Sequence, residues 1–402
     1  MIVVEKDYTD KDYLIDFQKF YCRSFGEKES TTTRVHFFKG FSTSQELKEV
    51  IPNAGDSLLR ENYLGFATKK PVVNRGGEHI VGRTALMPYP SSGSNHKRVY
   101  VVCPQRANLF GHELTFQSMP FQSQDAAVGA CASASVWAAL NPLFHLFETE
   151  KSSLYEITHN ANMIVQGESR IFPSSGLTAR QICGCLRNRG LEIEFLKIAK
   201  ARSEEFVKEL VGSFLKAFMR AGIPVIAGLE MREDGNDLPG FHAVTISGFL
   251  EEDNPILKEI YVHDDQIGPY ARVFSDDGFI TWKYERDEWA DKDEILLDSL
   301  TIPMYHKMRL PFPEIWHVWT RLNEDSSIST VDMFLYEGRK YKADLLSKDF
   351  DRKNEIIEKP MPHYLWVFRV KGSNGSITDS ILDATATYAS TPSTVVDEIT
   401  FH

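Results

Sequence analysis

The sequence predicts an α+β fold in which helices come first along the central part of the chain and an antiparallel sheet follows. Two observations predict it. Up to about residue 220, most readable segments of the central part place their apolar residues at helical spacing. Beyond that point, short apolar or alternating segments follow one another with few residues between them, which is typical of antiparallel strands.

We expect three parts along the chain, because 402 residues are enough for more than one domain. Residues 1–115 carry mixed helix, strand and turn signals and form an N-terminal extension of mixed α/β character. Residues 116–305 have the strongest periodicity and form the core. Residues 306–402 form a β-rich C-terminal extension with a Ser- and Thr-rich tail.

Three helices are predicted in the core. The first, residues 131–147, is rich in alanine and so favours helix. The second is capped by Ser175 or Thr178 and ends at Gly190. The third, Ser203–Arg220, places Phe and Leu side chains on one face, as a helix packed on a core does.

Strands are recognised in the core by apolar runs or by strict alternation. They are expected at Leu191–Ile198, Ile223–Leu229, Phe241–Phe249, Ile260–His263, Arg272–Phe274, Phe279–Tyr284 and Ile295–Pro303.

Fewer elements are predicted in the two extensions. They are helices at Tyr13–Phe25 and Ser44–Val50 and strands at Val99–Val102, Val331–Leu335 and His363–Val370. The tail after Gly372 is either a mobile end or finishes in a strand at Val395–Phe401.

Charge and composition exclude several classes of protein. The formal net charge is −11 and no basic run stands out, so we expect no nucleic-acid partner. The polar N-terminus does not resemble a signal peptide, and no apolar run approaches the roughly 18 residues of a membrane span. Five cysteines, an odd and sparse set, indicate a reducing compartment. We expect a cytoplasmic protein without a membrane partner; delivery by a specialised secretion system remains open.

Cys131 is the first candidate for chemistry, because it stands where the alanine-rich helix begins. Unpaired backbone N–H groups and the helix dipole stabilise a thiolate at such a position. Gln124, a short distance upstream, offers a side-chain N–H to an oxyanion. The alternative is structural, since a lone Cys in an alanine-rich helix is more often a small buried hydrophobic residue.

A thiol nucleophile needs a base, and the base needs an orienting partner. His242 opens one predicted strand and Asp264 ends the next, so antiparallel pairing brings the two together. Each has a structural alternative: a buried His bonded to backbone, and Asp264 and Asp265 in a turn that favours Asp. A cation site at His263, Asp264 and Asp265 is a weaker hypothesis, because no second ligand cluster is visible.

Taken together, these features resemble the papain-like fold and, within it, the bacteriocin-processing type of cysteine peptidase. The matching features, in chain order, are Gln124, Cys131, Gly176-Leu177-Thr178, His242-Ala243-Val244 and Asp264. The resemblance covers about residues 120–305. It implies a Cys-His-Asp triad and an oxyanion hole formed by the Gln side chain and the backbone N–H of the Cys.

The chain departs from the family pattern at three positions. Gln124 lies seven residues before Cys131, one more than is usual in the family, and Gln122 lies two residues further away. Ala132 replaces the Gly or Trp that usually follows the Cys, and Asp265 follows the acid where Pro is common. The oxyanion role therefore stays open between Gln124 and Gln122, and the third triad role between the two aspartates.

The resemblance implies a cysteine hydrolase that cleaves a peptide or isopeptide bond of a peptide or protein substrate through a thioester. The same groups serve an amidase or an acyltransferase. A different class is a catalytically inactive papain-like module that binds a peptide or partner protein, which the departures near Cys131 motivate. No metal or organic cofactor is implied. Asp237–Gly240, just before His242, is expected to form one rim of the cleft. Oligomeric state is not predictable.

Overall fold

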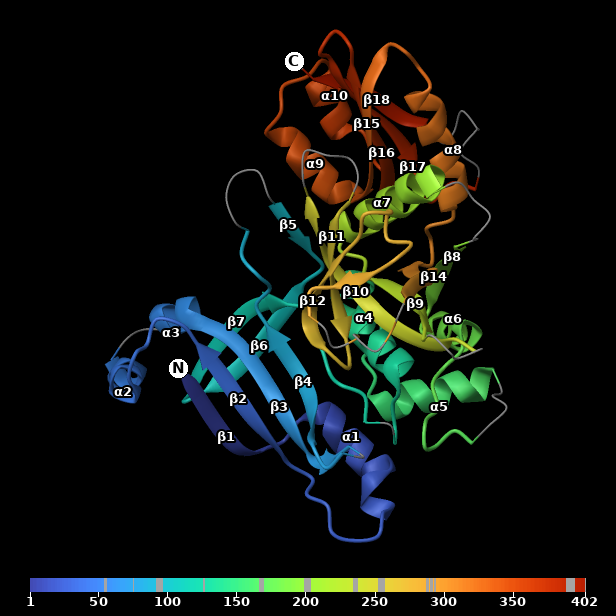
Figure 1. Ribbon diagram of the computed structural model, residues 1–402. Helices are drawn as coiled ribbons and strands as arrows, with labels where there is room; N and C mark the ends of the chain where they lie inside the picture. The colour runs from blue at the N-terminus through green and yellow to red at the C-terminus, as the bar shows by residue number, and fades with distance from the viewer. Residues whose placement is uncertain are drawn as a thin grey trace.

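The protein is a mixed α+β structure with antiparallel sheets, as the sequence predicts (Figure 1). The computed structural model describes the whole chain except residues 54–55, 75, 92–96, 126, 166–169, 199–203, 234–237, 252–256, 287–288, 290–291, 293, 388–394 and 402. Among the described helices, none combines the length and the apolar character needed to cross a membrane.

An antiparallel sheet occupies the centre of the protein. Its described strands are β5 (Lys97–Tyr100), β8 (Leu191–Lys197), β9 (Val225–Arg232), β10 (Gly240–Glu251), β11 (Glu259–Asp264), β12 (Gly268–Phe274), β13 (Lys283–Tyr284) and β14 (Glu294–Tyr305). The order across the sheet is β13, β12, β11, β10, β9, β14, β8. On one side of β10, its first part pairs with β9 and its last part with β5.

One predicted strand of this sheet is much shorter than expected. The segment Phe279–Tyr284 keeps only two residues as β13. Local side-chain bonds hold the preceding residues in a turn: the Ser275 hydroxyl accepts the N–H of Phe279, and the Asp277 carboxylate accepts the N–H of Thr281. Phe279 also has a φ of 66°, outside the extended region.

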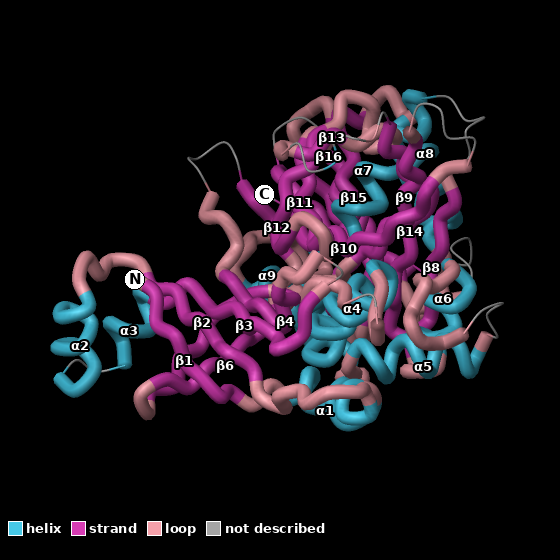
Figure 2. The backbone as a smooth tube through the Cα atoms, turned by 60° about the horizontal axis from the view of Figure 1, so that its bottom comes forward, coloured by secondary structure: helices cyan, strands magenta, loops and turns pink. Residues whose placement is uncertain are grey.

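Four helices follow the chain through the core: α4 (Cys131–Phe147), α5 (Leu154–Ile164), α6 (Ala179–Arg187) and α7 (Glu204–Arg220). Helix α4 packs on β10 (Figure 2) and is buried continuously from Ala132 to Leu143, as expected of a helix inside a core. Helix α6 is capped by Thr178, whose hydroxyl accepts the N–H of Gln181, so Thr178 rather than Ser175 is the cap.

The N-terminal part contains more strand than the sequence predicts. Its elements are β1 (Ile2–Tyr8), α1 (Lys11–Lys19), the 3-10 turn Tyr21–Arg23, β2 (Thr32–Phe38), α2 (Ser44–Asn53), α3 (Asp56–Asn62), β3 (Tyr63–Val73), β4 (His79–Leu86), β6 (Cys103–Leu109) and β7 (His112–Ser118). β1 to β4 form one sheet in chain order, and β6 and β7 form a hairpin.

Polar residues on a buried face hide these strands from sequence analysis. In β2 the buried positions include Arg34 and His36, which interrupt the apolar alternation. Arg34 donates to Glu5 at 2.7 Å, and His36 lies 2.8 Å from the Tyr63 hydroxyl. These pairings make the burial of both side chains tolerable, because a buried polar group needs a partner.

The C-terminal part places α8 (Phe312–Asn323), α9 (Gly338–Leu346) and α10 (Lys353–Glu358) beside a sheet of β15 (Ile328–Glu337), β16 (Tyr364–Gly372), β17 (Ile377–Asp383) and β18 (Val395–Phe401). Figure 1 shows it above the central sheet. The tail ends in the strand at Val395–Phe401 that was one of the two expectations. β17 was not predicted, and its buried Asp379, paired with Arg369 and Tyr341, interrupts its apolar pattern.

Candidate active site

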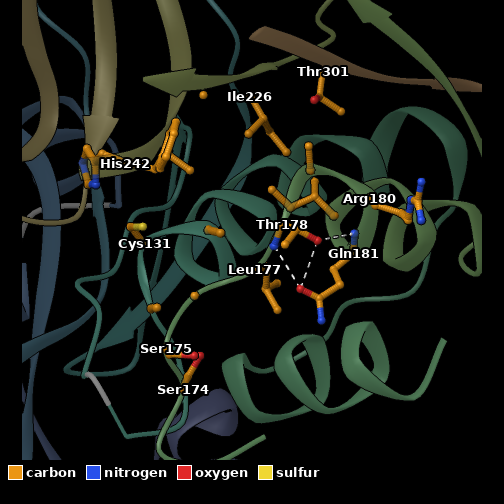
Figure 3. A pocket seen from close by; sticks show the side chains of 18 of the residues that line it. Cys131, Ser174, Ser175, Leu177, Thr178, Arg180, Gln181, Ile226, His242 and Thr301 are labelled. Atoms are coloured by element: carbon orange, nitrogen blue, oxygen red, sulfur yellow. Dashed lines mark hydrogen bonds between the residues drawn. The ribbon is translucent and has the colours of Figure 1, made fainter. Parts of the chain in front are cut away.

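Cys131 is the first residue of α4, as the sequence predicts, and its side chain is half-buried. The preceding residue, Ala130, has extended backbone and contributes no side-chain cap. The helix N-terminus therefore lacks a side-chain acceptor of its own at the cap position, and its N–H groups and dipole favour an anion beside Cys131. The thiol lines a cavity of about 1010 Å³ (Figure 3).

Asp125 holds the loop that leads from Gln124 to Cys131. One of its carboxylate oxygens accepts the backbone N–H groups of Ala127, Val128 and Gly129 at 2.8–3.1 Å. The other accepts the hydroxyl of Tyr21, from the N-terminal part, at 2.6 Å. Residues far apart in the chain thus fix the approach to α4.

His242 and Asp264 meet as the strand pairing predicts. His242 lies near the start of β10 and Asp264 is the last residue of β11; the two strands pair antiparallel. The Nε2 atom of His242 lies 3.1 Å from Oδ1 of Asp264, and both side chains are almost completely buried. This bond leaves Nδ1 of the imidazole for another partner. In Figure 3, Cys131 and His242 lie at the same end of the cavity.

The protonation of His242 reflects both neighbours. Burial alone would lower the pKa of its imidazole, but hydrogen bonds to the side chains of Asp264 and Cys131 outweigh burial and raise the pKa well above 6.5. The ring of Trp289 packs against the imidazole, with centroids 5.3 Å apart and the ring planes tilted by 60°. The positive imidazole is therefore favoured beside the thiol and sheltered from water on the Trp289 side.

Asp264 is the best-satisfied carboxylate of the site. Besides His242, it accepts the backbone N–H of Gln266 at 3.0 Å, the Tyr284 hydroxyl at 2.9 Å and the Trp289 indole N–H at 3.4 Å. Burial raises the pKa of Asp264, but the bonds to its neighbours, led by His242, hold it below the ordinary value. The carboxylate is thus kept charged although it has no exposed surface.

Asp265, the alternative third residue, has a different environment. Its nearer oxygen lies 3.8 Å from Nε2 of His242, beyond hydrogen-bond distance. Among the described residues, neither carboxylate oxygen has a hydrogen-bond partner, although the side chain is buried. Burial therefore raises the pKa of Asp265 to about 7. Of the two aspartates, Asp264 is therefore the hydrogen-bond partner of the imidazole.

The two candidate oxyanion residues are also placed differently. Gln124 lines the cavity together with Cys131. Gln122 is buried and does not line it, and among the described residues its side-chain nitrogen has no hydrogen-bond partner. The position of Gln124 fits the oxyanion role that the sequence suggests.

Three buried side chains at this end of the site also have ligand atoms close enough together to bind one cation. One ligating atom from each of His242, Asp264 and Asp265 lies within 4.8 Å of the others. His263, the third residue of the cation site considered from sequence, is turned elsewhere: its ring is fully buried between Phe121 and Tyr270. Burial lowers the pKa of His263 to about 3, so this imidazole is neutral.

A second, smaller pocket of about 330 Å³ adjoins His242 on its other side. Its lining residues include Leu238, Phe241, Gln266 and Trp289 but not Cys131. Of the predicted cleft rim Asp237–Gly240, residues Leu238–Gly240 therefore line this second pocket. Asp237 lies outside the described residues. Leu238 and Phe241 expose 84% and 71% of their surface, so this rim is an open apolar edge.

Sequence analysis missed the residues that support the site. Tyr284 and Trp289 donate to Asp264, and Tyr21 binds Asp125. Nothing in a short motif marks an aromatic residue as the donor to a carboxylate far along the chain. Only the folded chain brings these side chains together.

No protein-family model matches the chain, and no curated protein matches it in sequence. Function is therefore inferred from the geometry of the site and the pattern of the sequence.

Proposed function

We propose that this protein is a cysteine hydrolase of the papain-like type that cleaves a peptide or isopeptide bond. One observation carries the proposal: a buried imidazole is hydrogen-bonded to Asp264 at 3.1 Å while it shares the end of a large cavity with a thiol at a helix start. Nucleophile, base and orienting acid are the three parts that thiol catalysis requires.

In the first step, the Cys131 thiolate attacks the carbonyl carbon and forms a C–S bond. The oxyanion that develops is stabilised by the backbone N–H of Cys131 and the side chain of Gln124, which lines the same cavity. The C–N bond then breaks, and His242 transfers its proton to the leaving amine. The product that remains is a thioester on Cys131.

In the second step, His242 takes a proton from water, whose oxygen attacks the thioester carbon. The C–S bond breaks, the carboxylic acid leaves, and the thiolate and imidazolium are restored. Asp264 stays charged throughout and orients the imidazole, since four donors surround it. Transfer to an amine instead of water would make the protein an acyltransferase with the same residues.

Burial of the His242–Asp264 pair favours this function over a purely structural role. Moving a charged pair out of water costs roughly several kcal/mol per ion in desolvation, so the buried pair contributes little to the stability of the fold. In a catalytic site, the same burial keeps the imidazole oriented and its proton available.

The test is site-resolved alkylation by iodoacetamide between about pH 5 and pH 9, read by peptide mass spectrometry. An ordinary thiol has a pKa of about 8.5. We expect fast labelling of Cys131 near pH 6, lost in His242→Ala. Cys22 is exposed and serves as the internal reference. If Cys131 labels no faster than Cys22 at every pH, the proposal fails, and a binding module without catalysis becomes the better hypothesis.

A further inference from the structure

The described lining of the cavity that contains Cys131 carries an unbalanced positive charge. Arg170 and Arg180 line it, both are exposed, and neither forms an ion pair with a described residue. Among the described residues of its lining, the only carboxylate is Asp298, which is bound by Lys197. Within the described part of the lining, and apart from Cys131 and His242, the unpaired formal charges are therefore the two guanidinium groups.

Arg180 lies in the first turn of α6, whose dipole adds to the positive potential. In Figure 3 it lies at the end of the cavity away from Cys131 and His242, with Thr178 and Gln181 beside it. A cavity of about 1010 Å³ is larger than one side chain requires, so several residues of an extended substrate fit between the thiol and Arg180.

The two pockets beside His242 correspond to the two sides of the scissile bond. After the first step, the acyl part of the substrate stays bonded to Cys131, and Cys131 lines the large cavity only. The amine receives its proton from His242, which lines both. The acyl part therefore occupies the large cavity and the leaving part the small pocket, where the charges of Glu233 and Lys292 already pair with each other.

We propose that the substrate carries one or more carboxylate side chains on the acyl side of the scissile bond, and that Arg170 and Arg180 select them. The inference rests on the proposed function for the assignment of sides. It is independent of the net charge of the chain, which is −11 and by itself disfavours an acidic partner. The local charge of the cavity determines which substrate side chains bind, because guanidinium groups bind carboxylates through paired hydrogen bonds.

Three tetrapeptidyl acyloxymethyl ketones test the proposal: acetyl-Glu-Glu-Ala-Gly, acetyl-Gln-Gln-Ala-Gly and acetyl-Lys-Lys-Ala-Gly. The rate of Cys131 alkylation is measured for each. The acidic probe can form two exposed carboxylate–guanidinium pairs of ordinary strength, so it should react roughly tenfold faster than the basic probe. Salt at about 0.5 M should narrow the ratio, because it screens exposed charges.

The variant Arg170→Glu/Arg180→Glu should invert the order, so that the basic probe reacts fastest. A matched control is Arg309→Glu: this residue is exposed, lines neither pocket and has no described ion pair. It should leave the tenfold preference intact. Equal rates for all probes, or an acidic preference that survives the double substitution, would overturn the inference.

Iodoacetamide labelling in parallel separates the two proposals. Fast iodoacetamide labelling with no probe preference would overturn the charge selection alone. If Cys131 is unreactive, the hydrolase proposal fails, and fluorescein-labelled tetrapeptide methylamides of the same sequences then test the cavity by fluorescence anisotropy. Preferential binding of the acidic peptide, abolished in the double variant, would support the carboxylate site, and equal or absent binding would overturn it.

Discussion

The acid end and the thiol end of the candidate site are built in opposite ways. At the acid end, Asp264 is fully buried and surrounded by donors from β10, β13 and the segments after β11 and β13. At the thiol end, Cys131 is half-buried and opens into a large cavity, and its loop is fixed from behind by Asp125. The carboxylate proposed to orient the imidazole is enclosed, whereas the thiol proposed to react with substrate is accessible.

This difference shows which bonds should matter for thiol chemistry. Bonds at the acid end set the charge of His242 directly, because they lie in a dry environment where hydrogen bonds to ions are strong. Bonds behind the thiol end act only through the position of a loop. Substitutions in the two regions should therefore differ in the size of their effect on reactivity.

The largest effect is expected from Asp264→Asn. Losing the ionised partner lowers the pKa of His242, so the positive charge beside the thiol is lost at pH 6. A hydrogen bond to a charged group contributes about 1.5–3 kcal/mol, which corresponds to roughly a 10- to 150-fold slower alkylation of Cys131. Asp265→Asn is the matched control and should change the rate less than about threefold. Equal effects would contradict the assignment to Asp264, and a larger effect of Asp265→Asn would assign the orienting role to Asp265 instead.

Asp265→Asn should change the pH dependence of stability. The folded-state pKa of Asp265 is raised to about 7 from 3.8, so the folded protein binds this proton more tightly and loses stability as the pH rises from about 4 to about 7. The variant lacks this loss. Between pH 5 and pH 8 its free energy of unfolding should fall by about 2 kcal/mol less than that of the parent.

Urea unfolding at the two pH values measures this difference. EDTA is present throughout, because a cation bound by His242, Asp264 and Asp265 would also hold the carboxylate charged. If the free energy of unfolding changes equally with pH in the variant and the parent, the Asp265 carboxylate already has a hydrogen-bond partner in solution.

Tyr284→Phe should have an intermediate effect. It removes one of several donors to Asp264, which weakens the pair with His242 by about 1 kcal/mol and slows alkylation at pH 6 about fivefold. Tyr341→Phe is a close control, since Tyr341 donates to the buried Asp379 at 2.8 Å in the C-terminal part. Both variants should lose comparable stability, but only Tyr284→Phe should slow alkylation. A slowing in both would indicate general loosening of the fold.

The smallest effect on reactivity is expected from Tyr21→Phe, at the thiol end. The Tyr21–Asp125 bond fixes a loop and does not touch His242. A neutral donor to a carboxylate that keeps its backbone donors contributes about 1 kcal/mol or less. Only part of this loss reaches Cys131, because the bond acts through the position of a loop, so alkylation should slow by less than about threefold. Limited proteolysis should cut the loop before Cys131 faster than in the parent. Unchanged proteolysis would show that the backbone bonds to Asp125 suffice.

The sequence predicts most of the core because its apolar pattern is clear over most segments there; helix α5 and the turn before β13 were missed. Helix α4 begins at Cys131, and His242 and Asp264 meet because the order of two antiparallel strands is readable. The N-terminal sheet was missed because Arg34 and His36 occupy buried positions of β2. Burial there depends on partners, Glu5 and Tyr63, that only the folded chain brings near.

The contacts that position the candidate site residues could not be predicted either, and the reason is related. Gln124 and Gln122 are two residues apart, and which one faces the cavity depends on the path of a loop fixed by Asp125 and Tyr21. Likewise, Asp264 and Asp265 are chemically identical in sequence. Their difference arises from where Tyr284 and the backbone of Gln266 donate.

The pairing of β5 with the last part of β10 has a consequence for any loss of the N-terminal part. Residues 97–100 supply the edge strand along Gly248–Glu251 of the strand that also carries His242. Cleavage after residue 115 would remove β5 and leave backbone groups of β10 unpaired, and such an exposed edge promotes aggregation. A cut that keeps this edge covered therefore lies before Lys97 and leaves β5 attached to the core.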